Sequence, residues 1–542
     1  MKIEMQRIIA AGRITGLGEP NFSRDRGEVK KFYTSLDGHF AWLSDSRPTQ
    51  QARQVIQLIQ NARSKGLDPG NYDGPRLQSE LDSLGNEKSA AESAEVRFDL
   101  ALTVSAMRYI SDLYAGRMNP VAFGFELNVK HHKLGLAQFL KDQVVGAQDV
   151  GTAIASIEPQ IPEYQRTEQA LGRYLNLAAA EKPANRLPPI AKTVKPGGIY
   201  RGVPELARRL ATLGDLSPDQ AQKSTGTKYE GELVDAVKKF QRENGLDDKG
   251  DLGPETLRAL NASPESRIIH IAATLEHWRW LPRTESRLIV VNIPAYSLEA
   301  LDDQFRTELS MKVVVGDAYD HKTPELASEI KTVIFRPFWE VPLTIQKKEL
   351  APKIARNPKY LDTNDFEIVS AAGKPVERSS RVELAGLRSG ILKLRQKPGP
   401  DNAVGLVKFE FPNTGSVYLH GTPEKKLFDR KSRDLSHGCI RVEDPAALAA
   451  WVLRDSQGWS VDRVNAAMDG DKTERVPVAQ PVPVWIVYAT AVAAEDGSLT
   501  VHNDIYRYDE QFQRATRNAG TGARERSTSR EKSAKNHGAN DP

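Results

Sequence analysis

Hydrophobic residues recur at helical spacing through the first third of the chain. The run QQARQVIQLIQNARSKGLDPGNY places four apolar residues on one helix face and stops at Gly66. A second run, VRFDLALTVSAMRYISDLYAGRMNP, ends in the same way at Gly116, shortly before a proline. The pattern predicts a helical scaffold domain over residues 25–195, without obvious chemistry. Residues 264–285 are expected to complete it.

A linker rich in proline and glycine, LPPIAKTVKPGG, follows the scaffold. Beyond it, ELVDAVKKFQRENGLDDKGDLGPETLRAL indicates a helix that buries Val234, Val237 and Phe240, a Gly-Asp turn, and a second helix that begins near Pro254. Residues 196–263 are therefore predicted to form a small compact module. From the pattern alone, this module could equally be a helical spacer.

The periodicity changes after residue 282. Short β-branched and aromatic runs bounded by Gly, Pro, Asn and Asp predict strands: RLIVVNIPAYSLEAL, MKVVVGD, KTVIFRPFWEVP, GLVKFEFPN and GSVYLH. They define a mainly β domain over 286–510. The strand signal lapses within 345–395, and an insertion of that kind is a candidate lid. Residues 517–542 have almost no large apolar side chains and are predicted to be disordered. The fold class is therefore multidomain α+β.

Charge and apolar content narrow the classes of partner. The 542 residues carry 75 Lys and Arg against 71 Asp and Glu, a balance too even to suggest nucleic acid as a partner. The first twenty residues lack the uninterrupted apolar core that a signal peptide needs, so no export signal is expected. The most apolar later segment, PVPVWIVYATAVAA, is too short and too interrupted by proline to span a bilayer.

The single cysteine lies in a stretch that suggests chemistry, VYLHGTPEKKLFDRKSRDLSHGCIRVEDP. Alternation places Tyr418 and His420 on one face of a strand. Cys439 follows on a tight glycine turn. A thiol attacks as its thiolate, which a histidine favours by taking the proton, and a strand aims His420 well for that task. Gly438 lets backbone amides approach a reacting carbonyl, and the Tyr418 hydroxyl could help to hold an oxyanion. The arrangement suits acyl transfer through a thioester.

Two other interpretations stay open on spacing alone. Cys439 could be a packed core thiol, with His437 a histidine whose hydrogen bonds are satisfied within a turn. Alternatively His420, His437 and Cys439 could be three zinc ligands, although no fourth histidine or cysteine lies nearby.

The segment HGTPEKKLFDRKSRDLSHGC resembles the signature of the L,D-transpeptidase (YkuD-type) catalytic domain. The commonest form of the signature ends in Asn; here Ile440 and Arg441 stand, as in the larger multidomain branch typified by YcbB. VKKFYTSLDGHFAWL and DLYAGRMNP resemble the scaffold of that branch. EHWRWLP, VNIPAY, FWEVPLTI and KPGPDNAVGLVKFEFPN resemble its catalytic landmarks, and AVKKFQRENGLDDKGDLGPETLRALN is similar to a peptidoglycan-binding module. The implied architecture is a helical scaffold, a small three-helix peptidoglycan-binding module and a mainly β catalytic domain with an inserted capping subdomain.

The resemblance also implies roles for individual residues. Cys439 matches the nucleophile, His420 the general base, and Gly421 the position whose carbonyl orients that histidine. The remaining matches are expected to line the substrate site: Tyr418, His437, Gly438 and Arg441. No metal and no cofactor are expected.

The implied reaction joins peptidoglycan stem peptides. Cys439 would attack the third residue of a tetrapeptide stem, usually meso-diaminopimelate, and release D-Ala. An amine of a second stem would then form a cross-link between two third-position residues. Water or a D-amino acid as acceptor would give carboxypeptidase or exchange activity, and a non-catalytic peptidoglycan-binding protein is a further alternative. Peptidoglycan glycan and other cell-wall synthases are expected partners, carbapenems are expected to acylate the thiol, and the substrate implies a periplasmic location with a part in cell shape.

Overall fold

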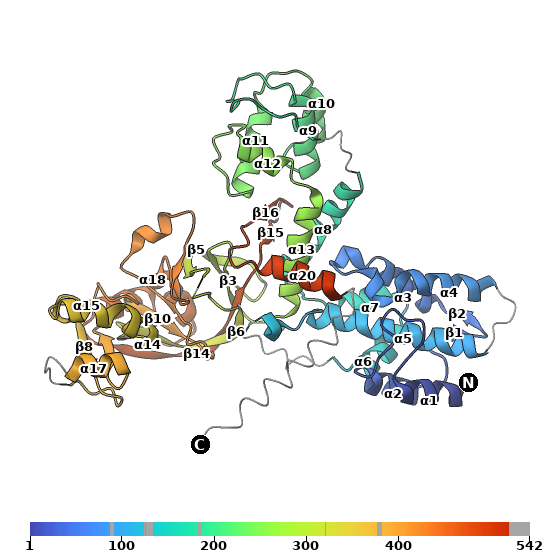
Figure 1. Ribbon diagram of the computed structural model, residues 1–542, viewed down its shortest axis with the longest axis horizontal. Coiled ribbons are helices and arrows are strands. Elements are labelled where there is room, and N and C mark those ends of the chain that lie inside the picture. The colour runs from blue at the N-terminus through green and yellow to red at the C-terminus, as the bar shows by residue number, and fades with distance from the viewer. Residues whose placement is uncertain are drawn as a thin grey trace. The chain divides into compact units, whose positions relative to one another are not determined.

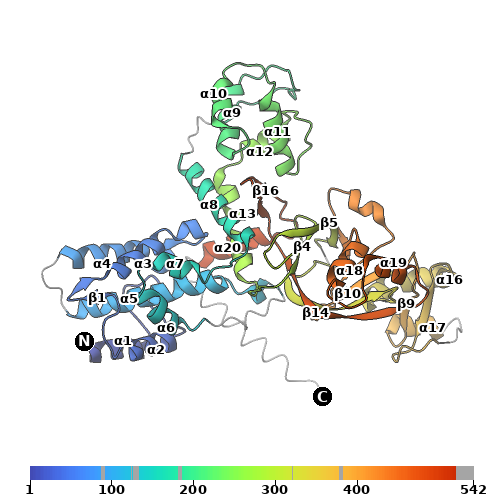
Figure 2. The same ribbon diagram turned by 180° about the vertical axis from the view of Figure 1, so that it is seen from behind.

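The protein is described by a computed structural model that covers residues 1–86, 92–123, 125, 134–180, 186–319, 321–376 and 382–519. The chain divides into two compact units (Figures 1 and 2). Unit 1 contains Met1–Asn119, Val129–Pro282 and the chain from Ala489 onward. Unit 2 contains Pro120–Asn128 and Arg283–Tyr488.

The scaffold of unit 1 is built around the long helix α5, as the apolar periodicity predicts. Its residues are buried almost continuously, and Asp99 in its first half has no exposed surface. The carboxylate of Asp99 accepts hydrogen bonds from the Tyr33 hydroxyl (2.7 Å) and the Trp42 amide (2.8 Å), so this buried charge is satisfied. The scaffold elements are α1 Lys2–Ala11, α2 Arg26–Ser35, β1 Leu43–Ser44, β2 Arg47–Pro48, α3 Gln50–Gln60, α4 Gly74–Asn86, α5 Glu92–Ala115, α6 Leu136–Phe139, α7 Val150–Ala155 and α8 Pro162–Ala180.

Helix α13, Pro264–Arg279, packs along α8 and returns the chain from the module to the scaffold. The segment after unit 2 joins the same region. The hairpin of β15 (Ala491–Ala493) and β16 (Leu499–Val501) contacts α8 and α13, and the Ala491 amide donates to the Thr274 hydroxyl at 3.1 Å. Helix α20, Tyr508–Ala519, packs on α13.

These contacts correct the expected end of the catalytic domain. The strand pattern predicts a domain that extends to residue 510, whereas unit 2 ends at Tyr488. The reason is that Asp509 of α20 accepts a hydrogen bond from Thr490 and pairs with His270 of α13, which fastens the final segment to the helices. Helix α20 also continues three residues past the expected start of the disordered tail, and the rest of that tail lies outside the described residues.

The module between residues 196 and 263 has its own hydrophobic core, to which Tyr229, Val237 and Phe240 contribute. Four helical segments form it, one more than expected: α9 Val203–Leu213, α10 Pro218–Lys223, α11 Glu232–Glu243 and α12 Pro254–Leu260. The additional segment is α10, which a capping box starts. The Ser217 side chain accepts from the Gln220 amide, and the Gln220 side chain accepts from the Ser217 amide.

Two carboxyl groups lie close together where the module meets the β15–β16 hairpin. Asp215 and Glu243 are hydrogen-bonded to each other, and the Lys239 ammonium lies 3.8 Å from each and 3.7 Å from Asp496 of the hairpin. Burial, and then the charge of Glu243, raise the pKa of Asp215 to about 7. The folded module therefore retains a proton that the unfolded chain releases.

The module is accordingly expected to become less stable as pH rises from 3.8 to about 7, the interval between the ordinary and the raised pKa of Asp215. The loss should be a few kcal/mol, on the order of 1.4 kcal/mol for each pH unit within this interval. Asp215→Asn should flatten this dependence, because an amide stays neutral at every pH, while replacement of the exposed Asp219 by Asn should leave it intact. Hydrogen exchange of α9 and α11, corrected for intrinsic rates at pH 5 and 7.5, measures the effect. Equal stability of the wild-type module at both pH values would contradict it.

Unit 2 is built on a nine-stranded mixed sheet in the order β12-β5-β13-β11-β10-β6-β14-β3-β4. Strand β4 also pairs with β5, so the hydrogen-bonded order closes on itself. The runs predicted as strands supply six strands of this sheet: β3 Leu288–Asn292, β4 Ser297–Leu301, β5 Thr307–Gly316, β6 Leu326–Phe335, β10 Val407–Glu410 and β11 Leu419–His420. Three further strands were not predicted: β12 Asp434–Ser436, β13 Ile440–Val442 and β14 Glu474–Val487. Helices α18 (Pro445–Leu453) and α19 (Val461–Asp469) follow the cysteine-bearing segment.

The insertion predicted within 345–395 belongs to a subdomain whose elements lie between Trp339 and Gln396, with its own core at one end of unit 2 (Figure 1). Its elements are β7 Trp339–Glu340, α14 Leu343–Ile345, a π-helical turn Gln346–Leu350, α15 Ala351–Arg356, α16 Tyr360–Thr363, β8 Phe366–Val369, α17 Val382–Ser389 and β9 Lys393–Gln396. The expectation that it lacks strands was wrong. β9 pairs with both β7 and β8, and such short strands depend on partners far along the chain rather than on a long apolar run.

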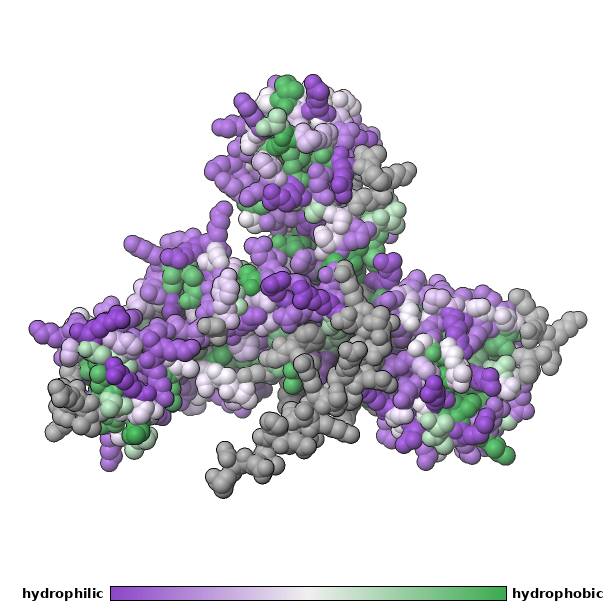
Figure 3. Space-filling model, viewed as in Figure 1, coloured by the Kyte–Doolittle hydropathy of each residue, from purple (hydrophilic) through white to green (hydrophobic). Residues whose placement is uncertain are grey.

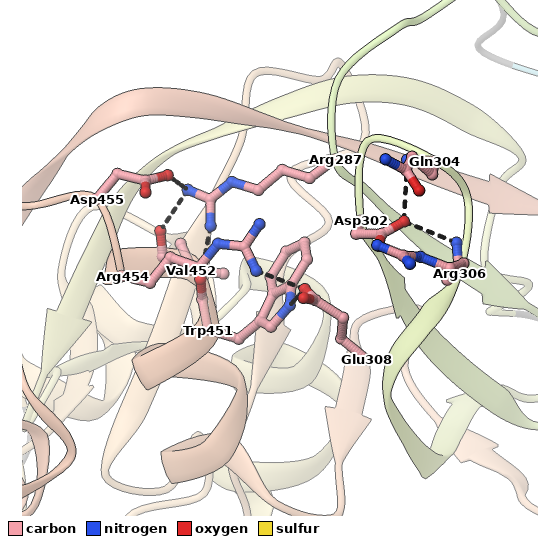
Figure 4. Close-up of polar contacts among 9 residues, drawn as sticks. All are labelled: Arg287, Asp302, Gln304, Arg306, Glu308, Trp451, Val452, Arg454 and Asp455. Carbon is pink, nitrogen blue, oxygen red and sulfur yellow. Dashed lines mark hydrogen bonds and ion pairs between the residues drawn. The ribbon is translucent and has the colours of Figure 1, made fainter.

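Helix α18 is held at its C-terminal end by a buried arginine that immediately precedes β3 (Figure 4). The Arg287 guanidinium donates to the Trp451 carbonyl at 2.7 Å and the Val452 carbonyl at 3.1 Å, and lies 5.0 Å from the centroid of the Trp451 ring. On the same ring, the indole N–H donates to Glu308 at 2.7 Å. A cation at a helix C-terminus complements the helix dipole. The helix that follows the cysteine turn is therefore fixed at its far end.

The side of the molecule seen in Figure 3 is dominated by hydrophilic residues, with hydrophobic ones in small separate groups. Among the described residues, no helix is both long enough and apolar enough to cross a membrane.

Candidate active site

Strand β11 brings the candidate residues together because it lies between β10 and β13 in the sheet. It runs parallel to β13, with His420 opposite Arg441, and antiparallel to β10, with His420 opposite Lys408. The Ile440 amide donates to the Tyr418 carbonyl at 3.1 Å, which fixes Cys439 beside Tyr418. His420, at the end of β11, and Cys439, immediately before β13, thus lie on neighbouring segments of the sheet and each contacts Tyr418.

His420 is buried, with 5% of its surface exposed. Its Nδ1 lies 2.6 Å from the Gly421 carbonyl oxygen, and because a carbonyl only accepts, Nδ1 carries the proton and Nε2 is the basic nitrogen. Burial, and then the charge of Arg441, lower the pKa of His420 to about 3. The imidazole is therefore neutral at physiological pH and able to accept a proton at Nε2.

The Cys439 thiol is partly exposed at the surface of this sheet. Burial raises the pKa of the thiol, although hydrogen bonds from the backbone and side chain of Tyr418 oppose the rise. The sulfur also lies 3.9 Å from the carbonyl oxygen of Ser416, a residue with φ of +53° in the β10–β11 turn. Asn413 holds that turn by accepting from the Val417 amide at 2.8 Å and donating to its carbonyl at 2.7 Å.

Tyr418 contacts both reactive groups. Its ring lies 5.4 Å from that of His420, between centroids, and its hydroxyl is hydrogen-bonded to Cys439. Burial, and then the charge of Cys439, raise the pKa of Tyr418 well above its usual value, so the hydroxyl keeps its proton. Alternation along the strand therefore placed Tyr418 and His420 correctly on one face.

Gly438 occupies a backbone conformation that favours glycine, with φ of +105°. Its carbonyl accepts from the Thr323 hydroxyl at 2.8 Å, and its amide donates to the Ser436 hydroxyl at 3.2 Å. The neighbouring Gly316 permits this approach, since an added Cβ there would lie 3.0 Å from the Gly438 Cα and 1.9 Å from the His321 carbonyl oxygen. The turn that presents Cys439 is thus fastened to β5 and the segment after it.

His437 and Arg441 are paired with carboxylates. His437 Nε2 lies 2.7 Å from Glu349 of the inserted subdomain, and its ring lies 4.7 Å from that of His321. The Arg441 guanidinium donates to Glu424 at 2.8 Å while the residue stands beside His420. The predicted site residues therefore share one region, although these two are engaged with protein groups.

Sequence reasoning missed two charged neighbours of this region, Glu349 and Lys408. Lys408 lies opposite His420, and its ammonium is 4.1 Å from the Tyr418 ring centroid. Its place in the run GLVKFEFPN, alternating with buried Val407 and Phe409, signals only that it faces away from the core. Glu349 carried no signal, because its contact with His437 spans 88 residues.

The raised thiol pKa and the lowered histidine pKa predict a neutral resting pair rather than a thiolate–imidazolium ion pair. Alkylation of Cys439 by iodoacetamide should therefore be slow at pH 7 and should rise about tenfold per pH unit up to pH 9, without a plateau. Because the chain has one cysteine, the labelled fraction measured by intact-protein mass spectrometry reports this thiol alone. A rate independent of pH between 5 and 8 would indicate a preformed ion pair instead.

Within the part of the chain that the structure describes, no group of three or more His, Cys, Asp or Glu side chains is arranged to hold a metal ion. The described geometry of His420, His437 and Cys439 therefore does not supply the three ligands that the zinc interpretation needs.

Family comparisons bear on the same region. Residues 286–484 match the family model described as the L,D-transpeptidase catalytic domain. This region of the chain is therefore similar to L,D-transpeptidase catalytic domains. Residues 201–260 match a model described as "Putative peptidoglycan binding domain", and residues 27–171 match one described as "Scaffold domain". The region that matches the catalytic-domain model contains the whole segment from Lys408 to Arg441.

A curated relative, "Putative L,D-transpeptidase" of Haemophilus influenzae, is 31% identical over 300 residues, which are 54% of this chain and 59% of the relative. The chain thus spans somewhat more than half the length of that relative. A solved structure, the L,D-transpeptidase (residues 123–326) from Xylanimonas cellulosilytica, is similar at 17% identity with a TM-score of 0.16. The alignment covers 55% of this chain and 99% of the solved chain.

Proposed function

We propose that the protein is an L,D-transpeptidase that forms peptidoglycan cross-links between the third residues of two stem peptides. The observation that carries the proposal is the contact of Tyr418 with both Cys439 and His420 inside the domain that matches the transpeptidase model. The match of the module to a peptidoglycan-binding model supports a glycan-bearing substrate.

In the first half-reaction, His420 Nε2 accepts the Cys439 proton, and the thiolate attacks the carbonyl of the third residue of a tetrapeptide stem. The Tyr418 hydroxyl, which keeps its proton, and backbone amides near Gly438 stabilise the oxyanion. The protonated imidazole then gives its proton to the departing amine of D-Ala, and the stem remains as a thioester on Cys439. Gly421 holds the imidazole in the orientation and tautomer that these steps need.

In the second half-reaction, a side-chain amine of meso-diaminopimelate from another stem attacks the thioester. His420 accepts the amine proton, the thiolate leaves, and the new amide is the cross-link. His437 and Arg441, at the rim of this region, can contact the stems once Glu349 or Glu424 is displaced. Carbapenems would acylate the same thiol. Neither a metal nor a cofactor takes part in these steps.

The substrate places the proposed activity in the cell envelope, on the periplasmic side, with a part in cell-wall organisation and cell shape. The peptidoglycan-binding module would hold glycan strands near the catalytic domain. Other cell-wall synthases are proposed partners, because cross-linking acts on strands that such enzymes polymerise.

The test is mass spectrometry of protein and products after incubation with purified disaccharide-tetrapeptide. We expect a mass increase on Cys439 equal to the mass of the disaccharide-tetrapeptide minus that of D-Ala, and a dimer that has lost one D-Ala. Tripeptide without dimer would replace the proposal with a carboxypeptidase, and exchange of added D-amino acid without dimer with an exchange enzyme. Peptidoglycan binding without any turnover would identify a non-catalytic binding protein.

A further inference from the structure

A row of three residues crosses the sheet at the candidate active site. In register, Lys408 of β10 is opposite His420 of β11, and His420 is opposite Arg441 of β13. Residues directly opposite one another on neighbouring strands extend to the same face of a sheet. The buried imidazole therefore has a cationic side chain as its direct neighbour on each side.

Lys408 is fixed in place by the next row of the same face. Its ammonium lies 4.1 Å from the centroid of the Tyr418 ring and 2.8 Å from the Glu410 carboxylate. Glu410 is held in turn by Arg475 at 2.6 Å. Only 20% of the Lys408 side chain is exposed, so its charge is screened less than that of a surface lysine.

We propose that Lys408 is a positioning residue of the active site that, together with Arg441, keeps His420 in its neutral, proton-accepting form and favours ionisation of Cys439. The inference rests on the proposed function for its catalytic consequence. Lys408 acts through His420 and through Tyr418, whose ring it covers and whose hydroxyl meets the thiol. The reactive pair itself consists of Cys439 and His420.

A nearby cation lowers the pKa of both the imidazole and the thiol, which leaves His420 neutral and makes Cys439 easier to ionise. A cation near an imidazole disfavours its protonated form, whereas a cation near a thiol favours the thiolate. After burial, the charges of Arg441 and Lys408 lower the pKa of His420, and the same two charges oppose the burial that raises the pKa of Cys439. Charged and titratable groups face His420 and Cys439 from three strands: Lys408 and Glu410 from β10, Tyr418 from β11 and Arg441 from β13. Two backbone carbonyls also face His420, those of Gly421, which follows β11, and of Val404 in the loop before β10.

A purely structural role makes a different prediction. If Lys408 served only to hold Glu410 and Arg475 at the edge of the site, its shape would matter and its charge would not. Lys408→Met keeps the aliphatic stem and removes the ammonium, while Lys408→Arg keeps the charge and changes the head group. The exposed Lys331 of β6, which lies 3.9 Å from Glu329, supplies a matched control on the same sheet.

The experiment uses the full-length protein and two probes that need no turnover. Iodoacetamide alkylation at pH 8 reports the thiol, and the ¹⁵N shifts of the His420 ring between pH 2 and 7, assigned with His420→Gln, report the imidazole. In Lys408→Met we expect alkylation to slow about three- to tenfold and His420 to protonate about one pH unit higher. Lys408→Arg should restore both values, and Lys331→Met should change neither.

Unchanged alkylation and an unchanged histidine titration in folded Lys408→Met would overturn the proposal, as would the same defect in Lys408→Arg. If Lys408→Met does not fold, Glu410→Gln replaces it as the test. Removing the countercharge of Lys408 should then speed alkylation about threefold, and an unchanged rate would overturn the proposal. Because neither probe requires substrate, shifts in both probes combined with no product from disaccharide-tetrapeptide would refute the transpeptidase and leave the role of Lys408 standing.

Discussion

Replacement of Cys439 by alanine is expected to abolish both the acyl-enzyme and the cross-linked product. The rate should fall by more than about 10⁴, because no other thiol exists in the chain and His420 would have no nucleophile to activate. Hydrogen replaces the sulfhydryl group, a small loss of volume at a partly exposed position, and the turn is fastened through Ser436, Gly438 and Thr323, so the fold should persist. Liquid chromatography with mass spectrometry of the disaccharide-tetrapeptide reaction measures the loss.

Two further variants make the result specific. Cys439→Ser replaces the sulfur nucleophile by an oxygen nucleophile. Because a hydroxyl is far harder to ionise than a thiol, a neutral imidazole should activate it poorly, and the cross-linked product should stay near the detection limit. Ser432→Ala alters an exposed residue of the same loop and should retain full activity. Cross-linking by Cys439→Ala at more than a few per cent of the wild-type rate would mean that the acyl group is carried elsewhere.

Features of this protein that depend on residues close together in the sequence could be predicted, whereas features that depend on distant segments could not. Helix α5 and six strands of unit 2, β3, β4, β5, β6, β10 and β11, follow from periodicity within ten to twenty residues, and they were predicted. The start of α18 is determined over an equally short distance, since Asp444 accepts from the Ala447 amide ahead of Pro445 at the first helical position. Alternation also placed Tyr418 beside His420.

The features that were missed depend on pairing between distant segments. The assignment of residues 489–510 failed because their partners are α8 and α13, more than 200 residues earlier. Strands β8 and β9 gain their hydrogen bonds from each other across a helix. Lys408 became visible as a neighbour of His420 only through the register of β10 against β11, and no local pattern determines that register. The raised pKa of Asp215 beside Glu243 likewise corresponds to no sequence motif, because the two residues are 28 positions apart.

The second large effect is expected in unit 1, where Arg279→Met should lower the free energy of unfolding by about 3–5 kcal/mol. Arg279 is 2% exposed, and its guanidinium donates to the Tyr164 hydroxyl at 3.0 Å and to the Lys65 carbonyl while lying 3.6 Å from Glu276. Tyr164 in turn donates to buried Glu158 at 2.7 Å. Methionine would fill much of the volume but leave the carboxylate of Glu276 without its buried cation, whereas Glu158 would keep its ion pair with Lys65 at 2.7 Å.

The comparison that isolates burial uses a second arginine of the same unit. Arg208 lies 2.9 Å from Glu205, but 70% of its side chain is exposed, so Arg208→Met should cost less than about 1 kcal/mol. Urea unfolding followed by hydrogen exchange of α8 and α13 gives the change for unit 1, and pulse labelling of Cys439 in the same samples follows unit 2 separately. If both substitutions shifted the α8 and α13 transition equally, the buried network would contribute no more to stability than a surface ion pair. The helical contact between α8 and α13 would then rest on its apolar packing alone.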